Sequence, residues 1–473
     1  MTTKSQKKPR SSSSKKSKRE SVSVRIIDEK TPLLINKKAE SSSFSSHGEA
    51  NGASFTGAVF NLSTTIIGAG IMALPATMKV LGLILGIVAI VFVGVLTELA
   101  IGMLLRFSKA GAVASYGAVM GDAFGAIGRK ALQVCVVINN IGVLVVYMII
   151  LGDVVSGSTS SGIHHPGLME SWFGQEWWTG RFFVLVVTTL GVFTPLAFLK
   201  RIDSLRHTSA VAVFLAVVFL VITAGIAVAK FIQGSIMWPR LLPDISDFNS
   251  IWTLFTVVPV LVTAYVCHFN VHSIENELED PSLIKPVVRT SLLLCSVIYI
   301  MTSFFGFLLF GDATLDDVLS NFDTDLGIPF SSQLNDAVRV SYALHLMLVF
   351  PVIFYPLRLN LDGLFFSSSS IPLTADNMRF TSLTIALMSV IFLGANFIPS
   401  IWDAFQFTGA TTAVCIGFIF PGIIVLRDGH GITTWKQKTL AVFMVGLAVF
   451  ASLVAIYSDA YAIFKRNATP TRE

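Results

Sequence analysis

The chain has 473 residues, of which 53% are hydrophobic and 13% are charged, and its formal net charge is +5. Soluble domains carry about 25% charged residues, so this composition excludes an ordinary soluble protein and indicates an integral membrane protein. We expect the lipid bilayer as its environment and no nucleic-acid partner.

Residues 1–54 form a separate block, rich in Ser and Lys and poor in large apolar side chains. Such a segment buries too little to fold, so we predict a disordered, basic, cytosolic tail without a cleavable signal. Basic charge beside a membrane also attracts anionic lipid. Within the tail, Glu29, Leu33 and Leu34 of EKTPLL fit the acidic dileucine pattern that sorting adaptors bind, a short pattern that also arises by chance.

Eleven apolar segments follow, each long enough to cross about 30 Å of hydrocarbon. They predict an all-α transmembrane domain over 55–460, followed by a short luminal tail at 461–473. The segments are approximately 55–79, 81–105, 131–156, 181–199, 207–230, 251–272, 288–310, 334–357, 380–398, 401–425 and 438–460.

The basic residues predict the orientation of these segments. With the N-terminal tail in the cytosol, most of the 34 Lys and Arg residues lie on the cytosolic side. This asymmetry satisfies the positive-inside rule. The loop between the seventh and eighth segments then lies on the opposite face, and it is rich in acidic residues: Asp312, Asp316, Asp317, Asp323 and Asp325.

Motifs of catalysis are missing from the sequence. It contains neither a GxSxG nucleophile elbow nor a HExxH zinc motif, and no phosphate-binding glycine loop. The four cysteines fall inside apolar segments and have no metal-binding spacing, so we expect no disulfide. We therefore expect no catalytic residues, no metal, no cofactor and no enzymatic activity.

The first apolar segment, FNLSTTIIGAGIMALP, is interrupted at its centre by Gly68, Ala69 and Gly70, and Pro75 follows. Glycine and proline cost about 1 and 3 kcal/mol in a helix interior. Irregular backbone at membrane depth is tolerated where it lines a buried cavity, as in transporters built from two inverted repeats. Glycines that allow close helix packing are the alternative explanation.

The sixth segment occupies the matching position in a second repeat, and it carries Pro259 followed by a polar stretch. We therefore predict five-plus-five inverted repeats with broken helices one and six and an eleventh helix. The N-terminal ends of half-helices favour a carboxylate and the carbonyl ends favour an ammonium, so the pair suits an amino acid. The candidate substrate residues are Thr64, Ile67, Gly68, Ala69, Gly70, Thr263, Tyr265 and His268.

Three stretches of the chain resemble the amino acid/auxin permease family over about residues 54–460. They are FNLSTTIIGAGIMALPATMKVLG, VCHFNVHSIENELED and LGANFIPSIWDAFQFTGATTAV. The chain is most similar to the plant vacuolar amino acid transporters of the sixth subgroup, beside the sodium-coupled neutral amino acid transporters. The resemblance implies a fold like that of the bacterial leucine transporter and transport of neutral or acidic amino acids.

Two departures from the sodium-coupled relatives bear on the coupling ion. The second Asn of their FNLSN motif, which helps to hold sodium, is Thr64 here, and their span-eight threonines are replaced around Met347, Leu348 and Val349. Sodium needs a cage of oxygens, so the loss favours proton coupling over sodium coupling or none.

His345 is the leading candidate for the proton site, because it falls near the bilayer midplane and its unperturbed pKa is about 6.5. Glu98 and His268 are the next candidates, since ionisable residues inside spans are often functional. Each has a structural alternative. His345 could stay neutral and bond a neighbouring helix, Glu98 could pair with a basic loop residue, and His268 could bond a freed carbonyl.

The sequence thus favours a proton-coupled carrier that moves neutral or acidic amino acids from the vacuole to the cytosol, with amino acids and protons as its partners. A sodium-coupled or uncoupled carrier and an amino acid sensor remain alternatives. The vacuolar membrane is the expected location, ahead of the endoplasmic reticulum and the plasma membrane.

Overall fold

The structure, a computed structural model, describes residues 52–160, 163–245, 248–323, 325–367, 369–398 and 408–468. Almost all of the predicted tail lies outside the described residues. The same holds for the sorting pattern of Glu29, Leu33 and Leu34 within it.

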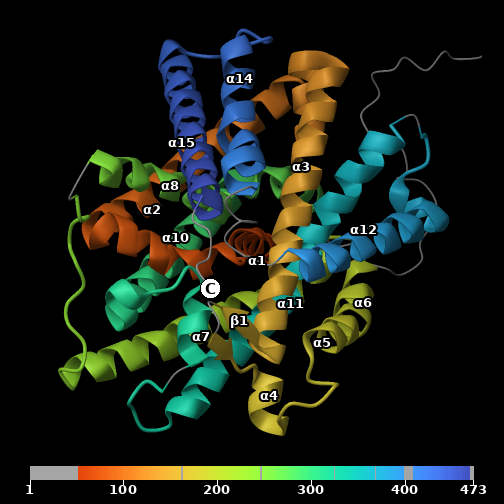
Figure 1. The fold of residues 1–473 in the computed structure, drawn as a ribbon. Helices are drawn as coiled ribbons and strands as arrows, with labels where there is room; N and C mark the ends of the chain where they lie inside the picture. The colour runs from red at the N-terminus through yellow and green to blue at the C-terminus, as the bar shows by residue number, and fades with distance from the viewer. Residues whose placement is uncertain are drawn as a thin grey trace, which may run out of the picture. The chain divides into compact units, whose positions relative to one another are not determined.

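Helices make up nearly all of the described chain (Figure 1). A small antiparallel hairpin, β1 (Ser158–Ser160) and β2 (Ile163–His165), was not anticipated from the sequence. The helices are α1 (Phe55–Ile66), α2 (Gly70–Ala110), α3 (Tyr116–Ser156), α4 (Leu168–Phe173), α5 (Arg181–Thr188), α6 (Thr194–Ala197), α7 (Arg206–Ile232), α8 (Phe248–Tyr265), α9 (His268–Glu277), α10 (Ile284–Phe310), α11 (Ser331–Phe365), α12 (Asn377–Phe397), α14 (Phe420–Arg427) and α15 (Trp435–Ala468).

In the described part of the chain, nine helices are long and apolar enough to cross a membrane. Two of the expected spans take other forms. The first consists of α1 and the beginning of α2, which turns at Gly82 (φ +72°) into the second span. The fourth is the shorter run Arg181–Ala197, which contains a π-helical turn. The predicted all-α membrane fold is confirmed, and α15 continues as a helix to Ala468.

The first break lies where the glycines predicted it. Helix α1 begins at the cap residue Ser54, whose hydroxyl accepts from the Gly57 N–H, and it ends at Ile66. Helix α2 begins at Gly70 and contains Pro75 in its interior. The glycine stretch therefore breaks the span, whereas the proline stays within a continuous helix.

The second break also exists, but it does not lie at the proline. Pro259 is inside α8, which continues to Tyr265, and the chain leaves the helix at Val266 and Cys267 before α9 begins at His268. Proline removes only one backbone donor, and neighbouring helices can compensate for that loss at membrane depth. The sixth span is thus broken, as predicted, and its break lies seven residues after the proline.

Side chains of α10 and α11 satisfy carbonyl groups that the breaks leave free. The hydroxyl of Tyr299 lies 2.6 Å from the Ile66 carbonyl oxygen and 2.7 Å from that of Ala264, so one side chain contacts both broken spans. Tyr342 donates to the Gly68 carbonyl at 2.6 Å. Helix α1 packs against α7, α9, α10 and α11, and Figure 1 shows it enclosed by longer helices.

Replacing Tyr299 by Phe should lower the stability of the folded protein. The variant leaves two buried carbonyls without their shared hydroxyl, which costs about 1–3 kcal/mol for an unsatisfied buried group. The measurement is the thermal unfolding temperature of the purified protein in detergent. Tyr265→Phe is the matched control, because among the described residues that hydroxyl pairs with the hydroxyl of Ser296 and with no backbone carbonyl. Equal stability of the Tyr299 and Tyr265 variants would contradict the bridging role.

Candidate functional site

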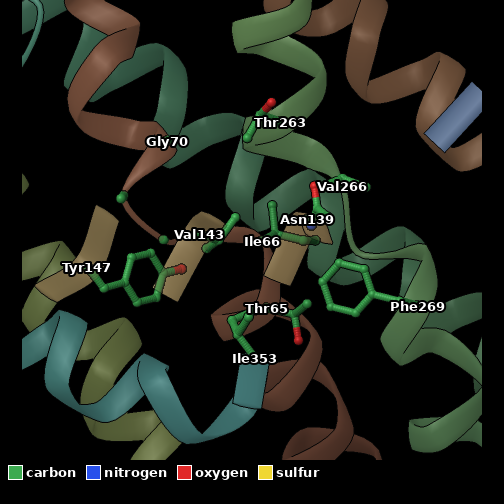
Figure 2. A pocket seen from close by; sticks show the side chains of 12 residues that line it. Thr65, Ile66, Gly70, Asn139, Val143, Tyr147, Thr263, Val266, Phe269 and Ile353 are labelled. Atoms are coloured by element: carbon green, nitrogen blue, oxygen red, sulfur yellow. The ribbon is translucent and has the colours of Figure 1, made fainter. Parts of the chain in front are cut away.

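A small cavity lies where the two broken spans meet α3 (Figure 2). Its volume is about 20 Å³, which is room for about one water molecule. Any larger ligand therefore requires the helices to part. The lining residues are Thr65, Ile66, Gly68, Ala69, Gly70, Asn139, Val143, Tyr147, Thr263, Val266, Phe269 and Ile353.

The first break presents backbone donors to this cavity, one of which, the Ala69 N–H, donates to the Tyr147 hydroxyl. Among the described residues, the N–H groups of Gly68, Ala69 and Gly70 donate to no backbone oxygen. Gly70 is also the first residue of α2, where the helix dipole is positive. This arrangement is suited to an anion such as a carboxylate.

The hydroxyl of Tyr147 is positioned against the same stretch. A Cβ atom placed on Gly68 would lie only 2.0 Å from the Tyr147 oxygen, so no other residue leaves room for that hydroxyl. A Cβ atom on Gly70 would lie 2.9 Å from the Cα of Ala264. The glycines thus allow two close approaches, one to α3 and one between the broken spans.

Residues beside the C-terminal ends of two half-helices line the same cavity. Helix α1 ends at Ile66 and α8 ends at Tyr265, and residues next to both ends line the cavity. The C-terminal end of a helix carries partial negative charge, which favours a cation such as an ammonium. N–H groups without backbone acceptors and the C-terminal ends of helices beside one cavity together complement a zwitterion.

Four of the eight residues expected to contact the substrate do line the cavity, namely Gly68, Ala69, Gly70 and Thr263. The other four do not line it. The hydroxyl of Thr64 donates to the Ser209 carbonyl at 3.0 Å, toward α7. The Ile67 side chain is buried elsewhere in the core.

Tyr265 and His268 also point elsewhere, so the expectation that they face the same cavity as Gly68 is not met. Tyr265 follows Thr263 by two residues, which turns it by about 200° around the helix. Its hydroxyl contacts that of Ser296 at 2.7 Å. His268 starts the next helix and lies beside Gly417.

Sequence reasoning missed the contribution of α3. Asn139, Val143 and Tyr147 follow one another at intervals of four residues, so they lie on one face of the helix. The available signal was a pair of adjacent asparagines, Asn139 and Asn140, inside an apolar span, where polar groups are costly. Phe269 and Ile353 complete the wall, and neither carries a distinctive sequence signal.

His345 lies behind the first break, fully buried, with both ring nitrogens next to carbonyl oxygens. Its Nδ1 is 2.7 Å from the Ala212 oxygen and its Nε2 is 3.1 Å from the Ile67 oxygen. A neutral imidazole can donate only one of these hydrogen bonds, whereas an imidazolium donates both. With a neutral ring, one of these two carbonyl oxygens therefore has no donor from His345.

Glu98 lies beside a basic residue, which is the structural alternative to a role in proton binding. Its Oε1 lies 3.9 Å from Nε of Arg289, and both side chains are substantially exposed. An ion pair between exposed side chains contributes little to stability. Glu98 does not line the cavity in this structure.

Comparison with protein sequences shows extensive similarity to amino acid transporters. The family model described as "Transmembrane amino acid transporter protein" matches residues 51–464. The Arabidopsis thaliana protein named "Amino acid transporter AVT6A" is 68% identical over 422 residues, which are 89% of this chain and 92% of that protein. "Amino acid transporter AVT6B" of the same plant is 64% identical over 444 residues, or 93% and 96% of the two chains.

Solved structures show the same fold at low sequence identity. MhsT in complex with L-phenylalanine matches with a TM-score of 0.59 and 12% identity, covering 87% of this chain and all (100%) of that one. A mutant manganese transporter of Eremococcus coleocola matches with a TM-score of 0.55 and 12% identity, covering 88% of each chain. The likeness confirms the fold that was expected from the broken spans.

Replacing Gly68 by Ala should destabilise the protein, because the added methyl group overlaps the Tyr147 hydroxyl. Overpacking of a buried site typically costs about 1–3 kcal/mol. The measurement is again the thermal unfolding temperature. Gly191→Ala is the control, since a Cβ atom there has no neighbour within 4 Å among the described residues. A Gly68→Ala, Tyr147→Phe double variant should regain part of the loss, and failure to regain any would refute the assigned contact.

Proposed function

Because the chain belongs to the transmembrane amino acid transporter family, we propose that it is a secondary carrier that moves amino acids across the membrane by alternating access. The family is one of transport proteins, and no enzymatic step is involved. One observation carries the proposal. The N–H groups of Gly68 and Gly70, which have no backbone acceptor among the described residues, share a cavity with residues beside the C-terminal ends of α1 and α8. Those two features complement the carboxylate and ammonium of an amino acid.

The small volume of the cavity supports alternating access. Room for about one water molecule excludes an amino acid from the conformation described here. Binding therefore requires α1, α8 and α9 to move relative to α3. The breaks at Gly68–Gly70 and at Val266–Cys267 provide hinge points in the two spans that would move.

We further propose that protons drive the transport, with His345 as the site that binds them. The ring lies between the carbonyl oxygens of Ile67 and Ala212, and an imidazolium would satisfy both of them. A sodium ion at this place would have to displace the ring from these oxygens. Thr64, which replaces a sodium-binding asparagine of the sodium-coupled relatives, is occupied in a hydrogen bond to Ser209.

A route for the proton from the far side of the membrane is suggested by Asp317, in the acidic loop between α10 and α11. Burial, together with the nearby charges of Asp153 and Asp316, raises the pKa of this carboxyl to about 7. Its charge also acts on Tyr342, whose ring stacks on His345 with 5.1 Å between centroids. Asp317 would therefore take up a proton from an acidic lumen and release it at neutral pH.

We propose the vacuolar membrane as the location, with the N terminus in the cytosol. An acidic lumen then faces the acidic loop, and the proton gradient drives amino acids from the vacuole to the cytosol. The names of the similar plant proteins give amino acid transport and no location. The proposed location is supported by the acidic dileucine pattern of Glu29, Leu33 and Leu34 in the sequence.

Purified protein in liposomes should take up radiolabelled alanine or glutamine when the outside is more acidic than the inside. The expected result is accumulation above that of empty liposomes, which a protonophore abolishes. Gly70→Val is the matched inactive variant, since its side chain would meet the backbone of Ala264. Binding of amino acids without any crossing under the pH gradient would refute the carrier and favour a sensor.

Replacing His345 by Gln should flatten the dependence of uptake on external pH, because Gln cannot carry the proton. In the wild type, uptake should increase as the proton-donating side becomes more acidic. His272→Gln is the control, since His272 is another buried histidine of the described chain that does not line the cavity. A His345→Gln protein that keeps the wild-type pH profile and still concentrates substrate would show that the proton binds elsewhere.

A further inference from the structure

We infer that Asn139 selects the substrate side chain and favours uncharged amino acids whose side chain donates a hydrogen bond, such as a carboxamide or a hydroxyl. The inference rests on the proposed function, and it assigns a substrate class to the same cavity. It depends on one buried oxygen atom, Oδ1 of Asn139, and on where α3 places it.

The orientation of the Asn139 amide follows from its neighbour. Asn140 donates through Nδ2 to the Ile353 carbonyl at 3.4 Å, which turns its own Oδ1 toward Asn139. The Nδ2 of Asn139 donates a hydrogen bond to that oxygen at 3.0 Å. The Oδ1 of Asn139 is therefore the atom left over. Reversing the Asn139 amide would bring two oxygens together, so the assignment of oxygen and nitrogen is determined by the hydrogen bonds.

This remaining oxygen has no hydrogen-bond partner among the described residues. Asn139 is 0% exposed and lines the cavity, next to Ile66 and Val266 in Figure 2. Buried polar atoms are nearly always hydrogen-bonded, and an exception calls for an explanation. We assign the missing donor to the substrate, because this oxygen belongs to a residue that lines the cavity.

The position along α3 separates the side-chain end of the cavity from its carboxylate end. Tyr147 lies beside the N–H groups of the first break, and Asn139 lies eight residues before it. Two helical turns separate the two residues along α3, and both side chains line the same cavity. The ammonium is bonded to the carbon next to the carboxylate, so it stays near the carbonyl ends of α1 and α8. Asn139 therefore faces the end of the side chain.

The other walls exclude the competing substrate classes. All the lining residues in the described chain are uncharged, so a charged side chain would find no ion partner. An acidic side chain would also place its oxygens against the Asn139 oxygen, and two acceptors do not bond. A purely apolar side chain would fit between Val143, Val266 and Phe269 but would leave the Asn139 oxygen unsatisfied. Sites built to bond a polar substrate discriminate strongly against analogues that lack the donor.

The test compares three amino acids of similar length as competitors of labelled alanine uptake into liposomes that contain the wild-type protein. Glutamine should inhibit at least about tenfold more strongly than norleucine or glutamate. In the Asn139→Leu variant, glutamine and norleucine should inhibit alanine uptake about equally. Asn396→Leu is the matched control, because it removes an exposed carboxamide on α12 that does not line the cavity, and it should keep the wild-type ratio of glutamine to norleucine inhibition.

The outcomes separate the inference from the function on which it rests. Alanine uptake with equal competition by all three amino acids would overturn the role of Asn139 and leave the carrier standing. An Asn139→Leu protein that retains the wild-type ratio would overturn it as well. The wild-type competition is informative even if a variant fails to fold. No uptake of any amino acid by the wild type would instead refute the carrier and, with it, the inference.

Discussion

Inside a membrane, each backbone group that leaves a helix must find a partner within the protein, and this requirement governs the structure. The two breaks free carbonyl groups and N–H groups alike. Tyr299, Tyr342 and His345 take up the carbonyl oxygens of the first break. The N–H groups of the same stretch are left without backbone acceptors in the described chain. This difference between donors and acceptors is the feature on which the proposed carboxylate site depends.

Much of the fold could be predicted from the sequence because the rules of a bilayer are strict. Length and hydropathy located the spans, and the Gly68–Gly70 stretch located the first break, since glycine costs a helix most where water is absent. The second break was predicted in the sixth span from Pro259 and the polar stretch after it, without an exact position, and it lies at Val266 and Cys267. Composition does not show which backbone group neighbouring helices will satisfy, and that choice decides where a helix ends.

The site was harder to predict than the fold, for a physical reason. Residues of the breaks were recognisable because they violate helix preferences, but Asn139 and Tyr147 sit in a regular helix and become important only through what they face. Helical rotation separates Thr263, which lines the cavity, from Tyr265, which contacts Ser296. A single sequence gives the spacing of such residues without the direction in which the face of the helix points.

One peptide group joins the two ligands of the proposed mechanism. The carbonyl oxygen that accepts from His345 belongs to Ile67, and the N–H on the other side of the same amide belongs to Gly68. A cation at the oxygen draws electron density through the resonant amide and makes its N–H a stronger donor. A proton on His345 would then tighten the hold on the substrate carboxylate. By thermodynamic reciprocity, the bound carboxylate would raise the affinity of His345 for its proton by the same factor.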